Sequence, residues 1–374
     1  MNTSFNNVSI NPRTRSWITA LVTTAVIATA CSSSNSPSDS TKPTAGEPAA
    51  RTVRIVAYDS FTPTKAVLDQ FTADTGINIE ILPKGDTGTM LNTSIIAKDE
   101  PFADVIWGID STFLSRAVAS GVLKPHGIAD PPTGASLQPA SGADLVVPVD
   151  TSEVCVNGDT QKLPAASSIG FDALADPANK SMLVVENPAT SAPGLAFLLA
   201  TISKFGEDGW QAYWKRLRDN DVKIVNGWEE AWNTEFSGSG GKRPLVVSYS
   251  NSPVAAVLFG ADPAATTTPL VVLKETCIGV VEYAGLLANT ATDNTENTAN
   301  SDATEVLEFL LSEAFQADLP TSLFVYPARE GLALPEIYSR LGIGPVDSPL
   351  TVDPQRVQAM RDAWIDEWTD IVLG

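Results

Sequence analysis

Histidine and cysteine are scarce in this sequence. One histidine, His126, and three cysteines occur among 374 residues. A single histidine excludes a multi-histidine zinc site, and it leaves room for a Ser-His or Cys-His catalytic pair only if His126 itself serves. We therefore expect no metal site, no cofactor and no hydrolytic triad.

Basic residues are also few. The 24 Lys and Arg residues stand against 44 Asp and Glu, which gives a formal net charge of −20. This excess of acids argues against nucleic acid or an anionic membrane surface as the main partner. The hydrophobic fraction of 43% is ordinary for a folded protein, and the length suits two lobes of about 150 residues each.

The first thirty residues have the pattern of an export signal. Residues 1–30 carry two bases, no acid and an apolar run that ends in small residues before Cys31. That run is shorter than the roughly 20 apolar residues of a membrane-spanning helix. Residues 28–31, Ala-Thr-Ala-Cys, resemble the end of a bacterial lipoprotein signal, in which Cys31 becomes the lipidated first residue. Ordinary cleavage that leaves Cys31 free is the alternative.

The residues after Cys31 predict a tether. Residues 31–51 are rich in Ser, Pro, Thr, Ala and Gly, without an aromatic side chain, and such a segment buries too little apolar surface to fold. We expect an exported protein, lipid-anchored on the outer face of the bacterial cytoplasmic membrane. In that oxidising compartment Cys155 and Cys277 favour one disulfide over two buried thiols.

The hydrophobic pattern predicts an α/β fold. Residues 53–58 are typical of a strand, residues 64–71 of a helix that ends at Gly76, and residues 77–82 of a second strand. A β-α-β unit of this kind implies a parallel sheet. Further strands are predicted at 103–108, 146–156, 181–185, 222–225, 245–249 and 270–273, and further helices at 85–96, 111–120, 194–205, 208–217, 228–236, 302–315 and 357–368.

Aromatic, acidic and hydroxyl side chains gather where the predicted strands end. Ligands of open α/β sheets lie beyond such strand ends. The segments here contain no Lys or Arg, which suits a flat, cationic, partly aromatic ligand; they are residues 58–61, 109–111, 188–194, 226–228 and 248–253. Asp110 serves equally well as a helix cap, whereas Ser191 at a helix start favours a phosphate.

An ordered set of short motifs carries a resemblance to a known family. The motifs are residues 58–61, 103–110, 188–195, 227–232, 248–253, 314–316, 320–327 and 364–368. Over roughly residues 52–370 the chain resembles the thiamine-binding solute receptors of bacterial ABC importers.

The resemblance implies a two-lobed, group II periplasmic-binding-protein fold, with mixed sheets in each lobe and a ligand cleft between them. Lobe 1 would comprise residues 52–148 and about 279–320, and lobe 2 about 149–278 and about 321–374. The implied ligand is thiamine or its phosphates, delivered by a monomer without catalysis to an ABC permease and its ATPase.

The resemblance also implies ligand-binding residues. The first lobe would contribute four side chains, Tyr58, Asp59, Ser60 and Asp110, the last to the aminopyrimidine. Ser191 and Ala192 would hold the hydroxyethyl or phosphate end, and the rings would pack near Trp228, Tyr249, Ser252 and Phe324. Two positions depart from the family pattern, since Ala255 and Phe324 stand where an aromatic residue and a tryptophan are usual; one lost aromatic wall weakens stacking by about 1 kcal/mol.

Two other classes of function remain open at this point. A polyamine or ferric-iron receptor would share the fold, and polyamine sites also combine acids with aromatic rings. A thiamine-degrading enzyme would use Cys155 as a nucleophile with a carboxylate such as Asp150. A disulfide to Cys277 excludes that chemistry, because only a thiolate attacks.

Overall fold

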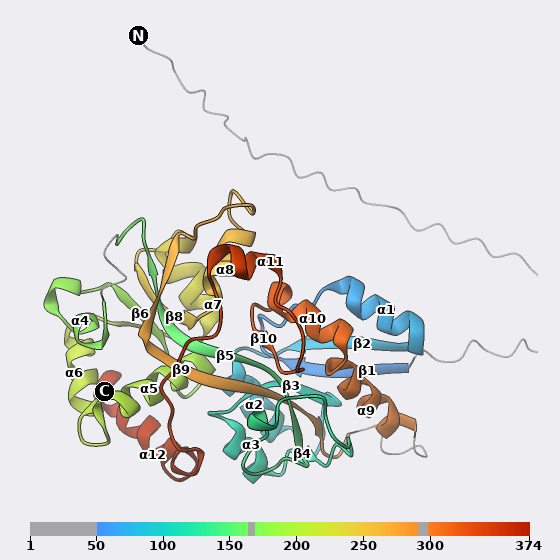
Figure 1. The fold of residues 1–374 in the computed structure, drawn as a ribbon. Coiled ribbons are helices and arrows are strands. Elements are labelled where there is room, and N and C mark those ends of the chain that lie inside the picture. The colour runs from blue at the N-terminus through green and yellow to red at the C-terminus, as the bar shows by residue number, and fades with distance from the viewer. Residues whose placement is uncertain (1–50, 164–168, 291–297) are drawn as a thin grey trace, which may run out of the picture. The chain divides into compact units, whose positions relative to one another are not determined.

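Two long strands run antiparallel through the middle of a ten-stranded sheet. They are β5 (Val146–Asp159) and β9 (Leu270–Leu287) in the computed structural model, which describes residues 51–163, 169–290 and 298–374 (Figure 1). The strand order is β2-β1-β3-β9-β5-β8-β6-β7, with β4 beside β9 and β10 beside β5. The sheet is therefore continuous from one end of the fold to the other.

The remaining strands are short. They are β1 (Arg51–Ala57), β2 (Ile77–Pro83), β3 (Val105–Asp110), β4 (Leu123–Lys124), β6 (Leu183–Glu186), β7 (Lys223–Val225), β8 (Leu245–Tyr249) and β10 (Tyr326–Pro327). The helices are α1 (Lys65–Thr75), α2 (Thr87–Ile96), α3 (Leu114–Ser120), α4 (Phe171–Leu174), α5 (Ala192–Phe205), α6 (Trp210–Asp219), α7 (Trp228–Glu230), α8 (Ser252–Leu258), α9 (Thr298–Leu310), α10 (Glu313–Ser322), α11 (Glu336–Leu341) and α12 (Pro354–Val372).

The strand directions divide the sheet into two halves. In the first half β1 pairs in parallel with β2 and β3, and in the second half β6 pairs in parallel with β7 and β8. Both β5 and β9 pair antiparallel with their neighbours and belong to both halves. The predicted mixed α/β class is confirmed. The residue boundaries of the two lobes stay a prediction.

The first β-α-β unit forms as its sequence predicts. Helix α1 ends because Gly76 takes a φ of 74°, a left-handed conformation that glycine adopts without strain, and donates its N–H to the Thr72 carbonyl at 2.8 Å. The chain then enters β2 directly, paired in register with β1 from Arg51↔Ile77 to Ala57↔Pro83. The carboxyl ends of β1 and β2 consequently lie side by side.

Apolar side chains fill the space on both faces of the sheet. One core packs under α9 and α10 and includes Trp107 and Phe315, whose rings meet edge to face at 5.5 Å. A larger core includes α5, α6 and α12, where Trp214 and Trp368 meet at 5.4 Å and are fully buried. The tryptophans of α6 and α12 thus pack in the core.

Two predicted elements are wrong in extent. The single helix predicted over 302–315 is two helices, because the Ser312 hydroxyl accepts the Phe315 N–H and starts α10 afresh. Asp302, where the predicted helix begins, lies inside α9 and pairs with Arg51 at 2.8 Å. The strand predicted at 270–273 extends to Leu287 as β9, and α8 and α11 were not predicted.

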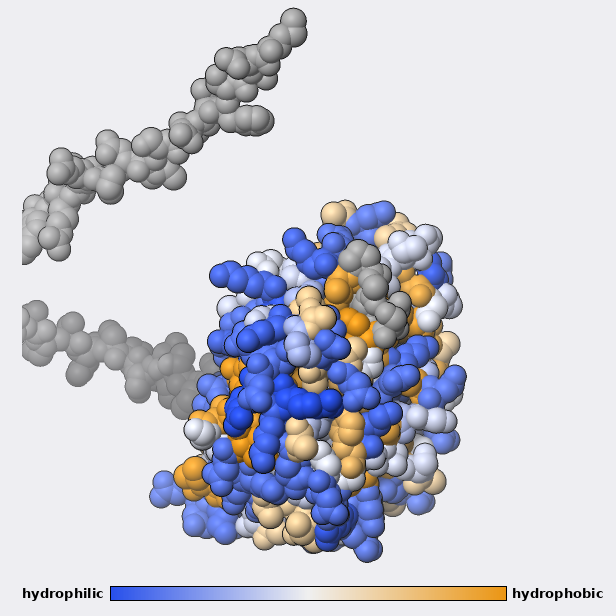
Figure 2. All heavy atoms as spheres, turned by 90° about the vertical axis from the view of Figure 1, so that its left-hand side faces the viewer, coloured by the Kyte–Doolittle hydropathy of each residue, from blue (hydrophilic) through white to orange (hydrophobic). Residues whose placement is uncertain are grey.

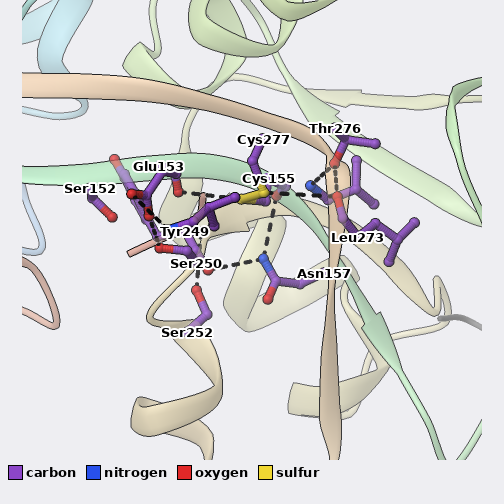
Figure 3. Close-up of a disulfide and its surroundings, with 12 residues drawn as sticks. Ser152, Glu153, Cys155, Asn157, Tyr249, Ser250, Ser252, Leu273, Thr276 and Cys277 are labelled. Carbon is purple, nitrogen blue, oxygen red and sulfur yellow. Dashed lines mark hydrogen bonds between the residues drawn. A yellow bond between two sulfur atoms is a disulfide. The ribbon is translucent and has the colours of Figure 1, made fainter. Parts of the chain in front are cut away.

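A disulfide joins the two long strands. Cys155 and Cys277 are fully buried, with their Cα atoms 4.2 Å apart, where the register of β5 against β9 shifts between Val154 and Val156 (Figure 3). The side chain of Asn157 donates to the Tyr249 carbonyl at 3.1 Å. The bridge therefore lies in the second half, where Cys155 is also paired with Ser248 of β8.

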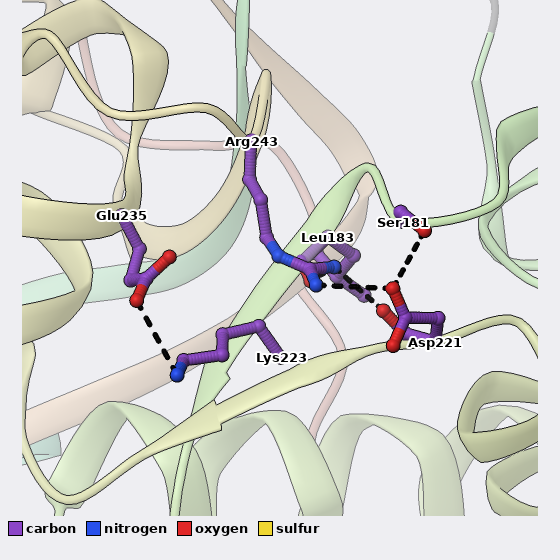
Figure 4. A network of polar contacts seen from close by, with 6 residues as sticks. All are labelled: Ser181, Leu183, Asp221, Lys223, Glu235 and Arg243. Carbon is purple, nitrogen blue, oxygen red and sulfur yellow. Dashed lines mark hydrogen bonds and ion pairs between the residues drawn. The ribbon is translucent and has the colours of Figure 1, made fainter.

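The far edge of the second half is held by polar contacts. Arg243 donates to the carbonyl oxygens of Leu183 at 3.2 Å and of Asp221 at 2.6 Å, and Lys223 pairs with Glu235 at 3.4 Å (Figure 4). Hydrophilic residues predominate over the face shown in Figure 2. Only eight of the described Asp and Glu residues are buried, so much of the acidic excess is solvated surface charge.

The predicted signal peptide (residues 1–30), Cys31 and most of the tether lie outside the described residues. Within the described part, no helix is both long enough and apolar enough to cross a membrane.

Candidate functional site

A pocket of about 340 Å³ lies where segments of both halves meet, a volume within the range of small-ligand sites. Its lining comes from the turn after β1, the start of α2, α7 and the turn that follows it, the end of β8, α8, β9 and the segment between α10 and β10. The lining includes Tyr58, Asp59, Ser60, Asp86, Trp228, Glu229, Trp232, Tyr249, Ser252, Ala255, Phe259, Glu282 and Phe324.

Seven of the ten predicted ligand-binding residues line this pocket: Tyr58, Asp59, Ser60, Trp228, Tyr249, Ser252 and Phe324. The other three are buried outside its lining. Asp110 accepts the Thr112 N–H at 2.6 Å, and Ser191 caps α5 by accepting the Gly194 N–H at 3.4 Å, with Ala192 next to it. The Asp110 carboxylate and the Ser191 hydroxyl, which were predicted to contact the ligand, thus accept hydrogen bonds from backbone N–H groups inside the fold.

One wall of the pocket is a pair of indoles. Trp228 and Trp232 stack with their ring centres 5.5 Å apart and their planes 18° from parallel. The Trp228 indole donates its Nε1–H to the Ser248 hydroxyl at 2.8 Å. Ser248 in turn lies 2.8 Å from the Ser252 hydroxyl, which also accepts the Tyr249 N–H at 3.1 Å. This series of hydrogen bonds fixes the plane of the Trp228 indole before a ligand binds.

A pair of phenyl rings lies at the rim of the pocket. Phe259 and Phe324 meet edge to face at 5.5 Å. Phe259 is 80% exposed although it is large and apolar, and Phe324 has a φ of 56°, a left-handed conformation that non-glycine residues rarely adopt. Such strain persists where the surroundings impose it, often at a ligand site.

Tyr58 links the rim of the first half to its sheet. Its ring lies against Gly108, where a Cβ atom would come within 2.3 Å of the ring. Its hydroxyl donates to Glu282 Oε2 at 3.0 Å. Burial, together with the charges of Glu282 and Asp150, raises the pKa of Tyr58 well above its ordinary value, so that it acts as a neutral donor.

Asp86 joins the start of α2 to the second half. One carboxylate oxygen accepts the Thr87 N–H at 2.7 Å, and the other accepts the Trp228 N–H at 2.9 Å. Nearby, the N–H groups of Gly88 and Thr89 donate to the Thr190 carbonyl at 3.1 and 3.3 Å. Burial raises the pKa of Asp86, although these donors oppose the rise.

The charge of the pocket has one sign. Four carboxylic acids line it (Asp59, Asp86, Glu229 and Glu282), and no Lys, Arg or His is among the described residues of the lining. Six aromatic rings share the same surface. Carboxylates and ring faces both attract positive charge, so the arrangement favours a flat cation.

Besides Ala255, five of the side chains in this lining were not predicted to bind the ligand, namely Asp86, Glu229, Trp232, Phe259 and Glu282. Three of them differ in the signal that the sequence offered. Asp86 follows β2 directly, so its position at a strand end was a usable signal. Trp232 lies one turn after Trp228 in a segment that was predicted to be helical. Glu282 lies within β9, and no local signal distinguishes it.

The cysteine chemistry considered for an enzyme is not available in this arrangement. Cys155 is bonded to Cys277 and neither lines the pocket. A bridged sulfur cannot attack as a thiolate.

Known proteins of similar sequence and fold are binding proteins. The chain is 27% identical over 323 residues to the thiamine-binding periplasmic protein of Brucella suis biovar 1 (strain 1330), which covers 85% of this chain and 91% of that protein. It is 28% identical over 318 residues to the thiamine-binding periplasmic protein of Escherichia coli (strain K12), covering 84% and 91%. A solved periplasmic thiamin binding protein matches with a TM-score of 0.74 and 25% identity, over 86% of this chain and 96% of that one.

Residues 66–343 match the family model described as bacterial extracellular solute-binding protein. The description of this family and the names of the relatives both state solute binding. The chain belongs to the bacterial extracellular solute-binding protein family.

Proposed function

We propose that this protein captures thiamine outside the cytoplasm and delivers it to an ABC importer, without catalysing a reaction. The observation that carries the proposal is the lining of the pocket, with four carboxylic acids, six aromatic rings and no base among its described residues. Thiamine is a fixed thiazolium cation joined to an aminopyrimidine ring. Both rings suit aromatic walls, and the charge suits carboxylates. The relatives named for thiamine binding support the same ligand.

The two halves have distinct roles in this proposal. The indoles of Trp228 and Trp232, with Tyr249, pack against the rings of the ligand, and Phe324 covers them from the rim. Tyr58, Asp59 and Ser60 meet the ligand from the first half, and Ser252 holds the indole wall in place. The roles of Asp110, Ser191 and Ala192 in contacting the ligand stay predictions, since all three are buried outside the lining.

The charge of the pocket lining also predicts which thiamine compound binds more tightly. A diphosphate would bring up to three negative charges next to four carboxylic acids, with no base to pair with them. We therefore expect free thiamine to bind more tightly than thiamine diphosphate. The same lining would admit a polyamine, whereas no group of three His, Cys, Asp or Glu side chains in the described residues is arranged for a metal ion.

Calorimetry of the purified protein against thiamine, thiamine diphosphate, spermidine and ferric citrate tests the proposal. We expect a Kd for thiamine of about 1 μM or tighter, and a Trp228→Ala variant that binds at least about tenfold more weakly. Ile96→Ala, which alters an exposed side chain outside the pocket, is expected to bind as wild type. Absence of thiamine binding by the folded protein would refute the proposal, and tight spermidine binding in its place would make the protein a polyamine receptor.

The cellular part of the proposal concerns Cys31. Lipidation at Cys31 would hold the folded part near a permease and its ATPase through residues 31–51. Incorporation of a fatty-acid label that is lost in Cys31→Ala supports the anchor. Release of unlabelled wild-type protein from cells would instead favour ordinary cleavage.

A further inference from the structure

Three buried carboxylic acids lie side by side on adjacent strands next to the pocket. Glu282 on β9 is paired in register with Asp110 on β3 and with Asp150 on β5. Their exposed fractions are 5%, 1% and 0%. Directly paired residues point to the same face of a sheet, with Cβ atoms about 4.5–5.5 Å apart. We call Asp110, Glu282 and Asp150 the carboxyl row.

The carboxyl row has few hydrogen bonds and no base. Glu282 accepts from the Tyr58 hydroxyl, and Asp110 accepts from the Thr112 N–H. Within the part of the chain that the structure describes, no N–H or hydroxyl donor reaches the carboxyl oxygens of Asp150, and the group that shares a proton with them is the carboxyl of Glu282. The titratable groups that face the row are all tyrosines or acids: Tyr58, Tyr249, Tyr283 and Asp86.

Three neighbouring buried carboxylates without a cation cannot all be ionised, because burial and mutual repulsion both disfavour the charge. Burial raises the pKa of Asp110 to about 6 and that of Asp150 to about 8. Burial, and then the charges of Asp150 and Asp110, hold the pKa of Glu282 well above its ordinary value. The free protein therefore carries protons in this row near neutral pH.

Glu282 connects the carboxyl row to the ligand site, because it lines the pocket while its two partners, on the strands to either side, are outside the lining. We infer that the row is the charge-selecting subsite of the pocket: it holds a proton in the free protein and releases it to solvent when a cationic solute binds at Glu282. The exchange is balanced in atoms and in charge: the protonated protein and one cation give the complex and one released proton. The inference rests on the proposed function only in that the solute is a cation.

The direction of the pH dependence follows from this exchange. A bound cation stabilises the ionised row and lowers its pKa values, so binding strengthens as pH rises between about 6 and 8, the values of Asp110 and Asp150. Full release of one proton corresponds to about a tenfold gain in affinity per pH unit. A neutral solute gains nothing from the exchange, so the row selects for charge as well as for shape.

Calorimetry with thiamine in buffers of different ionisation enthalpy measures the protons released, after subtraction of the titration of thiamine itself. We expect wild type to release between about half a proton and one proton at neutral pH. Asp150→Asn and Glu282→Gln remove titrating groups with little change of shape, and each is expected to release less than half the wild-type value. Glu153→Gln is the matched control: Glu153 is a buried acid on β5, bonded to Ser250 and to the Val346 N–H and outside the pocket lining, and its variant should release as many protons as wild type.

The outcomes separate this inference from the proposed function. Thiamine binding with equal affinity at pH 6 and pH 8 and no proton release would overturn the inference alone, as would unchanged release in both row variants. The wild-type measurement decides even if a row variant fails to fold. Absence of thiamine binding at every pH would overturn the proposed function and this inference with it.

Discussion

The carboxylate of Asp86 accepts the backbone N–H of Trp228 at 2.9 Å, across 142 positions of sequence. Its other oxygen accepts the N–H of Thr87 at 2.7 Å. One side chain therefore caps α2 in the first half and fixes the start of α7 in the second. Since Trp228 forms the indole wall, the position of that wall depends on an acid from the opposite half.

We predict that Asp86→Asn weakens thiamine binding about tenfold or more. An asparagine side chain has one acceptor oxygen, so it cannot accept from both Thr87 and Trp228. It also removes a negative charge from the lining. A hydrogen bond to a charged group contributes about 1.5–3 kcal/mol, and part of this is used to hold the indole in place. Calorimetry with thiamine measures the change.

The control for this variant is Asp353→Asn. Asp353 caps α12 by accepting the Gln355 N–H at 2.9 Å and has no part in the pocket. The Asp353→Asn variant is expected to bind thiamine as wild type does, although it weakens the cap of α12 about as much as Asp86→Asn weakens the cap of α2. If Asp86→Asn also binds as wild type does, Asp86 does not position the indole wall.

Gly88 provides the second test of how the halves meet. A Cβ atom at Gly88 would lie 2.8 Å from the carbonyl carbon and oxygen of Thr190, closer than packed atoms approach. We predict that Gly88→Ala pushes α2 away from this turn and weakens thiamine binding about fivefold or more, because overpacking costs about 1–3 kcal/mol. Calorimetry with thiamine is again the measurement.

Gly344→Ala is the matched substitution for Gly88→Ala. Gly344 has no atom within 4 Å of the position of an added Cβ, so we expect unchanged binding. Equal affinities of both glycine variants would show that the contact between Gly88 and Thr190 does not support the ligand-binding arrangement.

The parts of the fold that the sequence predicted well are local. Strand β1, α1 and β2 follow one another within residues 51–83, so hydrophobic period and Gly76 suffice to identify them. Strand β9 was predicted only over residues 270–273, and the polar residues Lys274, Glu275 and Thr276 follow directly. Its continuation is stabilised by pairing with β5, more than a hundred positions away, which no local pattern records.

The site shows the same division between local and long-range information. Tyr58, Trp228 and Tyr249 were predicted because they follow strand ends, where an α/β sheet places its ligand. Glu282 was missed because its role comes from register, which sets it between Asp110 and Asp150. Residue type alone does not distinguish it from a solvated glutamate.

The raised pKa of Asp110 predicts how the stability of the free protein depends on pH. This pKa is about 6 in the folded protein, against an ordinary value of 3.8. The folded state therefore holds this proton more tightly than the unfolded chain does. The contribution is fully present below pH 3.8 and is lost as pH rises through about 6. The difference is on the order of 3 kcal/mol.

Urea denaturation at pH 5 and at pH 8 measures this effect, with Asp110→Asn as the comparison. Asparagine keeps an acceptor for the Thr112 N–H but does not titrate. We expect the wild-type free energy of unfolding to fall more steeply between these pH values than that of the variant. Surface acids with lowered pKa, such as Glu207 and Asp221, act at lower pH. Equal pH dependence of the two proteins would contradict the prediction.

The disulfide between Cys155 and Cys277 is predicted to stabilise the fold without forming the ligand site. It links positions 122 residues apart, and a closed loop of that size contributes on the order of 4–5 kcal/mol through the entropy of the unfolded chain. The double variant Cys155→Ala/Cys277→Ala should therefore unfold at a lower urea concentration, whereas its affinity for thiamine should change less than about threefold, because neither sulfur lines the pocket. Treating the wild type with reductant should lower its stability toward that of the variant. If wild type with reductant consumed thiamine and the double variant did not, Cys155 would be a nucleophile and the protein an enzyme.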